Sequence, residues 1–103
     1  MAVKTITEKN FETEVIHSEK TILVDFFAPW CSVCKMVSPI IDQIGVEAVD
    51  FAVGKLDVDE NPALSEKFGV MSVPTLVVFK NGKEVRRAVG AKSKSAIIEM
   101  INS

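Results

Sequence analysis

Two cysteines, Cys31 and Cys34, are the residues of this sequence best suited to chemistry. They are the only cysteines in 103 residues, and Ser32 and Val33 separate them. In a first helical turn this spacing places the two Cβ atoms about 5–6 Å apart, so small adjustments bring the sulfurs into bonding range. Such a pair favours thiol-disulfide exchange. We expect Cys31 to lie exposed at the helix mouth as the nucleophile, and Cys34, one turn further in, to be the shielded resolving thiol that keeps its proton longer.

Two other interpretations of the cysteines stay open at this point: half of a zinc site, or two inert core thiols. Zinc needs four ligands, and His17 is the only histidine. The acidic stretch 57–61 is similar to the start of a calcium loop, but Pro62 and Phe68 occupy the positions of the required glycine and glutamate. We therefore expect a redox dithiol that needs neither a metal nor a bound organic cofactor.

The cysteines lie where a predicted strand meets a predicted helix. Residues 21–27 form an apolar, β-branched run, interrupted by Asp25, that is typical of a buried central strand. Residues 32–47 carry apolar side chains at helical spacing and include Pro39. The first turn of a helix has unpaired N–H groups and the positive end of the helix dipole, which stabilise a thiolate. The sequence thus predicts an activated thiol at this junction.

The alternation of patterns predicts one α/β domain over residues 1–103, with a mixed sheet and helices on both faces. Thr7, Asn61 and Ser93 are candidate helix caps, and Asn81 with Gly82 predicts a hairpin turn. The element order is βαβαβαββα. The strands are expected at 3–6, 21–27, 51–57, 75–79 and 84–89, and the helices after Thr7, at 32–47, at 62–68 and after Ser93.

Composition and charge exclude several classes of protein. The formal net charge is −2 and no basic stripe occurs, which argues against nucleic-acid binding. No apolar run approaches the roughly 18 residues of a membrane span, and the N-terminus lacks the apolar segment of a signal peptide. We expect a cytoplasmic monomer without a membrane association.

Several motifs point to one known family; they lie at residues 24–31, 34–36, 39, 55–57, 73–75 and 79–82. Together they resemble the thioredoxin family, and the similarity extends over residues 3–102. The implied fold is the thioredoxin fold, a central mixed five-stranded sheet with four flanking helices. The implied function is protein-disulfide reduction by a reversible Cys31–Cys34 disulfide. The implied partners are disulfide-containing target proteins and an NADPH- or ferredoxin-linked thioredoxin reductase.

Three further positions acquire roles from this resemblance. Burial of Asp25 would raise its pKa, and such a carboxylate can accept the proton of Cys34; the family places its buried acid at this position. Lys55 matches the family lysine near that acid. Pro74 would be trans on the usual frequency of X–Pro bonds, but the resemblance implies a cis bond that packs against the cysteine pair.

An apolar target-binding surface is expected around the cysteines. Trp30 adjoins the nucleophile, and the backbone of Val73 is expected to pair with a bound peptide strand. The complete expected surface is Trp30, Ser32, Val33, Met71, Val73, Gly90 and Ala91.

The sequence departs from the family in two places. Ser32 and Val33 replace the usual Gly-Pro, and Phe27 stands where a second tryptophan is common. A hydroxyl that caps the helix or donates to a thiolate, and a freed N–H, would stabilise the reduced form. We therefore hypothesise a less reducing couple. A thiol oxidase or isomerase, or a non-catalytic interaction subunit, remain as alternative functions.

Overall fold

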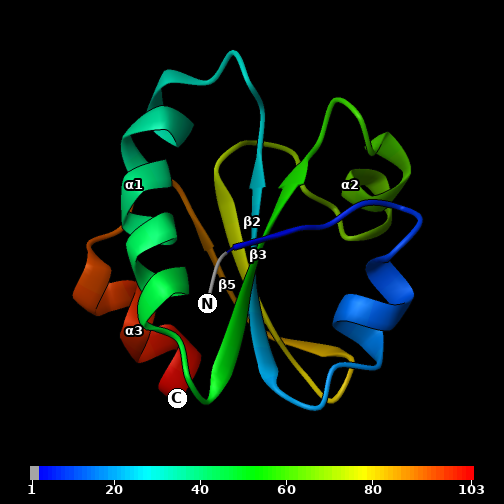
Figure 1. Cartoon of the computed structure of the whole chain (residues 1–103). Coiled ribbons are helices and arrows are strands. Elements are labelled where there is room, and N and C mark those ends of the chain that lie inside the picture. Colours follow the sequence, from blue (N-terminus) through cyan, green and yellow to red (C-terminus); the bar gives the residue numbers. More distant parts are fainter. Residues whose placement is uncertain (1–2) are drawn as a thin grey trace.

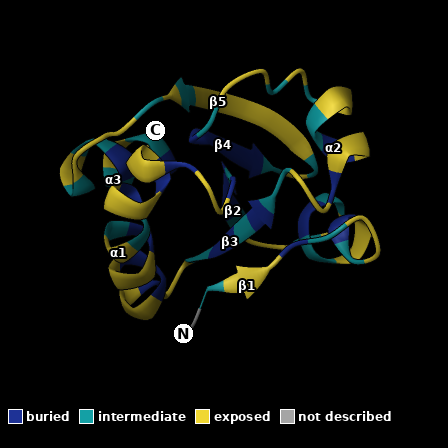
Figure 2. Ribbon diagram, turned by 90° about the horizontal axis from the view of Figure 1, so that it is seen from above, coloured by how far each residue is buried: buried dark blue, intermediate teal, exposed yellow. Residues whose placement is uncertain are grey.

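Five strands form one mixed sheet in the order β1-β3-β2-β4-β5. The structure is a computed structural model that describes residues 3–103. The central strand β2 pairs in parallel with β3 and antiparallel with β4, and Figure 2 shows the sheet from above. This arrangement confirms the predicted α/β fold. The strands are β1 (Lys4–Thr5), β2 (Thr21–Phe27), β3 (Phe51–Asp57), β4 (Thr75–Lys80) and β5 (Lys83–Val89).

Four helical segments cover the two faces of the sheet. α1 and α3 lie on one face, and η1 and α2 lie on the other (Figure 1). The segments are η1 (Glu12–Ile16), α1 (Ser32–Glu47), α2 (Pro62–Lys67) and α3 (Lys94–Asn102). The first segment is a short π-helix rather than the predicted α-helix. None of the helices within residues 3–103 is both long enough and apolar enough to span a membrane.

Side-chain alternation along β2 divides its residues between the two faces. Ile22, Val24 and Phe26 pack toward η1 and α2, whereas Leu23 packs toward α1 and α3. Burying each of these apolar side chains stabilises the fold by about 1.5–3 kcal/mol. A shift of the β2 register by one residue would turn all of them to the wrong face and lose this free energy several times over. The same alternation directs Asp25 toward α1. The register of the sheet therefore places the Asp25 carboxyl group beneath α1, the helix at whose start the cysteines lie.

Two of the predicted local signals are confirmed. Asn81 and Gly82 have φ values of 53° and 78°, as expected for the hairpin between β4 and β5. Ser93 caps α3, because its Oγ accepts a hydrogen bond from the N–H of Ala96 at 3.2 Å.

Two predicted caps are wrong, because their side chains have other partners. Asn61 makes no capping bond to α2; its Oδ1 accepts from the N–H of Glu8 at 2.9 Å, and its Nδ2 donates to the carbonyl of Asp57 at 3.0 Å. Thr7 Oγ1 accepts from the N–H of Lys9 at 3.2 Å, in a turn that precedes η1. Asn61 thereby fastens the loop after β3 to the N-terminal segment.

Candidate active site

The two cysteines lie at the junction of β2 and α1, as predicted. Cys31 is the N-cap of α1, and its Sγ accepts a hydrogen bond from the N–H of Cys34 at 3.1 Å. The sulfur atom itself satisfies one of the N–H groups that a helix start leaves unpaired. The cap suggested for Ser32 is wrong: Ser32 is the first residue of the helix and is exposed.

The expectation that Cys31 is exposed is wrong. Cys31 is 7% exposed and Cys34 is 4% exposed, and both are free thiols. They are covered because they pack in one cluster with Ala28, against which Phe27 and Val73 also lie. The Cys31 thiol donates to the carbonyl oxygen of Val73 at 3.6 Å. Cys31 therefore lies directly against Val73.

Burial distinguishes Cys34 chemically. Burial raises the pKa of the Cys34 thiol, and its contact with the Cys31 sulfur raises this pKa further. A raised pKa means that Cys34 holds its proton at neutral pH. The structure thus agrees with the expectation that the second thiol keeps its proton, and it requires a proton acceptor when Cys34 reacts.

Asp25 is the buried acid that the sequence suggested. It is 1% exposed, and its Oδ1 has no hydrogen-bond partner among residues 3–103. Burial raises the pKa of Asp25 to about 7, although the Lys55 charge lowers it and the Asp42 charge raises it. A carboxyl with this pKa changes its protonation state within the neutral range.

Lys55 lies opposite Asp25 in the β2–β3 register. Its ammonium group nevertheless points to α1: it forms an ion pair with Asp42 Oδ1 at 2.8 Å and a short hydrogen bond to Ser38 Oγ. A cavity of about 220 Å³ adjoins Asp25, Cys34, Ser38 and Lys55. Asp25 and Cys34 therefore share one cavity with Lys55 and Ser38.

A second cavity, of about 350 Å³, lies on the other side of the cysteines. Trp30 and Met71 are 70% and 96% exposed there. The Trp30 Nε1 donates to Asp59 Oδ2 at 2.8 Å, which fixes the orientation of the indole. We call this cavity the front groove; it is lined by Trp30, Val58, Pro62, Ser65, Glu66, Val70, Met71, Ser72 and Val73.

The other residues expected at the site do not line the front groove. The Val73–Pro74 bond is cis, as the resemblance implied. Gly90 donates its N–H to the carbonyl of Pro74 at 2.9 Å, so the segment after β5 is held beside this proline. Val33 and Ala91 are exposed. The structure thus brings Trp30, Met71 and Val73 together in one groove. The other expected surface residues are outside its lining: Ser32, Val33, Gly90 and Ala91.

Sequence reasoning missed three polar residues at this site. Ser38 and Asp42 hold Lys55, and their spacing of four residues on a predicted helix was the available signal. Asp59 binds Trp30; it belongs to the acidic stretch that was compared with a calcium loop. Among residues 3–103, no group of three His, Cys, Asp or Glu side chains is placed to hold a metal ion.

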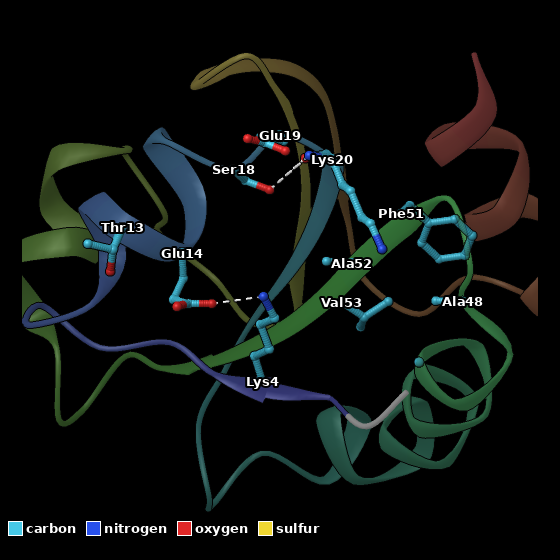
Figure 3. Close-up of a pocket in the computed structure, with 11 residues that line it drawn as sticks. Lys4, Thr13, Glu14, Ser18, Glu19, Lys20, Ala48, Phe51, Ala52 and Val53 are labelled. Atoms are coloured by element: carbon cyan, nitrogen blue, oxygen red, sulfur yellow. Dashed lines mark hydrogen bonds and ion pairs between the residues drawn. The ribbon is translucent and has the colours of Figure 1, made fainter.

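A third hollow, of about 340 Å³, lies next to Lys4, Glu14, Lys20 and Phe51 (Figure 3). Lys4 pairs with Glu14 at 2.8 Å, and Ser18 Oγ donates to the carbonyl of Lys20 at 2.7 Å. Neither cysteine nor His17 lines this hollow. The chemistry of the molecule is therefore concentrated at the junction of β2 and α1.

Two free thiols at the start of a helix, with a buried acid behind the second, define a thiol-disulfide oxidoreductase. Comparison with known families supports the same class, since residues 2–103 match the thioredoxin family. The chain belongs to the thioredoxin family. Members act on disulfide-containing targets and depend on a reductase, so this chain has both kinds of partner in general terms.

Several curated thioredoxins are similar to this chain over nearly its whole length. Thioredoxin of Mycobacterium tuberculosis (strain ATCC 25618 / H37Rv) is 48% identical over 98 residues, which cover 94% of this chain and 84% of that protein. Thioredoxin of Chlamydia caviae is 42% identical over 100 residues, 97% of this chain and 96% of that protein. Thioredoxin of Rickettsia bellii is 43% identical over 99 residues, 95% and 94% of the two chains.

Proposed function

We propose that this thiol-disulfide oxidoreductase works as a protein-disulfide reductase in which Cys31 is the nucleophile and Cys34 the resolving thiol. The Cys31 thiolate attacks one sulfur of a target disulfide, a mixed disulfide forms, and the other target sulfur leaves as a thiolate. Cys34 then loses its proton and attacks the Cys31 sulfur. The Cys31–Cys34 disulfide forms, and the target leaves with the two electrons of the dithiol.

Asp25 takes the proton of Cys34 in this scheme. A thiol with a raised pKa reacts slowly unless a base accepts its proton. Asp25 adjoins the same cavity as Cys34, and its pKa of about 7 leaves a substantial fraction ionised at neutral pH. Lys55 tunes this acid, because its charge lowers the pKa of Asp25. The proton-acceptor role of Asp25 rests on the cavity that it shares with Cys34.

Targets bind in the front groove as an extended segment beside Val73. Trp30 and Met71 offer apolar contacts, and the cis Pro74 follows Val73, which packs against the cysteines. Ser32, Val33, Gly90 and Ala91 complete the contact surface. The protein acts as a monomer in the cytoplasm, and an NADPH- or ferredoxin-linked thioredoxin reductase returns the disulfide to the dithiol. Incubating the oxidised protein with each reductase type would show which electron donor serves it.

Trapping of the mixed disulfide tests the two thiol roles. Cys34→Ser should accumulate a covalent complex with a disulfide protein such as insulin, visible on a non-reducing gel and released by dithiothreitol. Cys31→Ser, which keeps a thiol at the other position, is the matched control and should give no complex. Failure of Cys34→Ser to form any complex with an oxidised target would reject the assigned roles.

A further inference from the structure

Lys55 is placed to interact with two carboxylates but contacts one. Asp25 is its direct neighbour across the β2–β3 pair, whereas Asp42 belongs to α1. The ammonium lies 2.8 Å from Asp42 Oδ1 and bonds Ser38 Oγ, and Asp25 Oδ1 stays without a hydrogen bond among the described residues. A buried carboxyl oxygen without a partner, next to a lysine directed elsewhere, calls for an explanation.

The two α1 residues form a small anchoring site. Ser38 and Asp42 are separated by one helical turn, so both side chains lie on the same face of α1. The Lys55 side chain is 21% exposed and that of Asp42 is 58% exposed, which places this ion pair nearer to solvent than Asp25. An ammonium group held here keeps part of its hydration, whereas at Asp25 it would lose nearly all of it.

We propose that Ser38 and Asp42 are positioning residues that hold the Lys55 ammonium away from Asp25 and thereby leave Asp25 free to accept the proton of Cys34. This inference rests on the proposed role of Asp25 in the reaction. It adds Ser38 and Asp42 to the machinery as residues that act through Lys55.

Charge placement explains why the anchoring matters. A lysine in direct contact with Asp25 would stabilise the carboxylate and lower the pKa of Asp25 by roughly 1–3 units, which would weaken it as a base toward a thiol. The charged and titratable groups around Asp25 are Lys55 from β3, and Cys34, Lys35 and Asp42 from α1, with Cys31 at the start of that helix. The β4 neighbour is the apolar Leu76. Burial is the largest cause of the raised pKa of Asp25, and Lys55 is the cation whose charge opposes it.

Titration of the Asp25 carboxyl carbon by ¹³C NMR, in the reduced full-length protein, tests the proposal. In Asp42→Asn we expect the pKa of Asp25 to fall by on the order of one unit, because the lysine is released toward Asp25 and a repelling charge is lost. Ser38→Ala should give a smaller fall, and Asp42→Glu should restore the wild-type titration. An unchanged titration in both Asp42→Asn and Ser38→Ala would overturn the proposal.

Glu47→Gln is the matched control. Glu47 lies on the same helix and pairs with Lys94 at the same distance of 2.8 Å, but neither residue is near Asp25. This variant should leave the titration of Asp25 unchanged. A shift equal to that of Asp42→Asn would mean that any lost carboxylate on α1 has the effect, and it would refute the positioning role.

A double-mutant comparison separates positioning from simple repulsion. In a Lys55→Gln background no ammonium remains to be held, so Asp42→Asn should shift the pKa of Asp25 by less than half as much as in the wild-type background. An equal shift in the two backgrounds would show that Asp42 acts by its own charge alone and would overturn the proposal.

The pH profile of mixed-disulfide resolution distinguishes this proposal from the proposed function. The acid limb of the profile should move to lower pH in Asp42→Asn by the same amount as the NMR titration, and Asp25→Asn should abolish that limb. If Asp25→Asn reacts at the wild-type rate with an unchanged profile, the proton-acceptor role fails. The NMR titrations would still decide whether Ser38 and Asp42 position Lys55.

Discussion

The first turn of α1 separates two regions of opposite character. On the front side, Trp30 and Met71 are largely exposed around a groove that is also lined by Val73, which packs against the cysteines. On the rear side, Cys34 faces a smaller cavity with a buried acid and a lysine. Under the proposed function, this single helical turn separates target recognition from proton transfer. A substitution on one side should therefore change one of these tasks and preserve the other.

Local geometry produces this division. Cys31 is the N-cap and lies against Val73, which precedes β4, whereas Cys34 is inside the helix and lies toward the sheet. Side chains three residues apart share a face of a helix, but Cys31 is the N-cap and has an extended backbone, and its Sγ accepts from the N–H of Cys34. The two sulfurs are therefore adjacent while their other neighbours differ.

The largest expected effect concerns the rear region and the stability of the fold. Asp25 has a pKa of about 7 in the folded protein, against 3.8 as its ordinary value. Below pH 3.8 it is protonated in both states. Between pH 3.8 and 7 the unfolded chain releases the proton and the folded chain keeps it, so stability falls as pH rises. The loss approaches about 4 kcal/mol above pH 7.

Denaturant unfolding of wild type and Asp25→Asn between pH 3.5 and 8.5 measures this effect. The free energy of unfolding of the variant should gain about 4 kcal/mol relative to wild type across that range. The fixed cost of a buried amide is the same at every pH and cancels in the comparison. A difference that stays constant with pH would show that Asp25 is not buried as a raised-pKa acid.

Much of the fold was predictable because its signals are local. Both β2 and β3 and the whole of α1 have the predicted bounds, since apolar periodicity and turn residues decide them. The π-helical form of η1 was not predictable, because the apolar spacing of this short segment does not distinguish it from an α-helix. The predicted capping bond of Asn61 was wrong because its side chain accepts from the N–H of Glu8, 53 positions away. A capping rule considers only neighbouring residues and does not include such a distant partner.

The site was predictable in its chemistry and less so in its contacts. Cys31, Cys34 and Asp25 stand out by residue type, because cysteine pairs and an acid in a buried strand are rare. The burial of Cys31 depends on Val73, 42 positions away, and it was missed. The partner of Lys55 depends on how α1 lies over β3. Whether Lys55 pairs with Asp25 or with Asp42 is decided by tertiary packing, and the spacing of these residues along the chain does not reveal it.

A substitution in the front groove should have a smaller energetic effect than the pH-dependent loss of stability at Asp25, and it should affect target binding alone. Trp30→Ala removes a large exposed ring from the front groove, and we expect about a thirtyfold loss of kcat/KM for protein disulfides, equivalent to about 2 kcal/mol. The pKa of Asp25 should stay at its wild-type value, because Trp30 does not adjoin the rear cavity. Insulin reduction kinetics and the NMR titration measure the two quantities.

Asp59→Asn tests whether the orientation of the indole matters. Its side chain can still accept from the Trp30 Nε1 through the amide oxygen, so the loss of kcat/KM should be much smaller than in Trp30→Ala. Asp59→Leu removes the acceptor, and its loss of kcat/KM should lie between the losses in Asp59→Asn and Trp30→Ala. A Trp30→Ala protein with unchanged kcat/KM would show that targets do not use the front groove.

The smallest expected effect lies between the two regions, at Ser32 and Val33. Replacing them by Gly and Pro removes an exposed hydroxyl and the N–H of the second helical residue, and we expect the loss of this N–H at the positive end of α1 to disfavour the reduced form. The reduction potential should fall by about 30 mV, equivalent to about 1.4 kcal/mol for two electrons. Titration against glutathione measures the potential of the wild-type and variant couples.

The single variants Ser32→Gly and Val33→Pro separate the hydroxyl from the N–H. Ser32 is exposed and does not cap α1, so we expect the larger part of the fall from Val33→Pro. Since the Cys34 N–H still reaches Cys31 Sγ in every variant, the nucleophile itself should be preserved. A Gly-Pro variant with an equal or higher potential would refute the hypothesis that Ser32 and Val33 make this couple less reducing. It would also remove the one sequence feature that favours oxidase or isomerase activity over reduction.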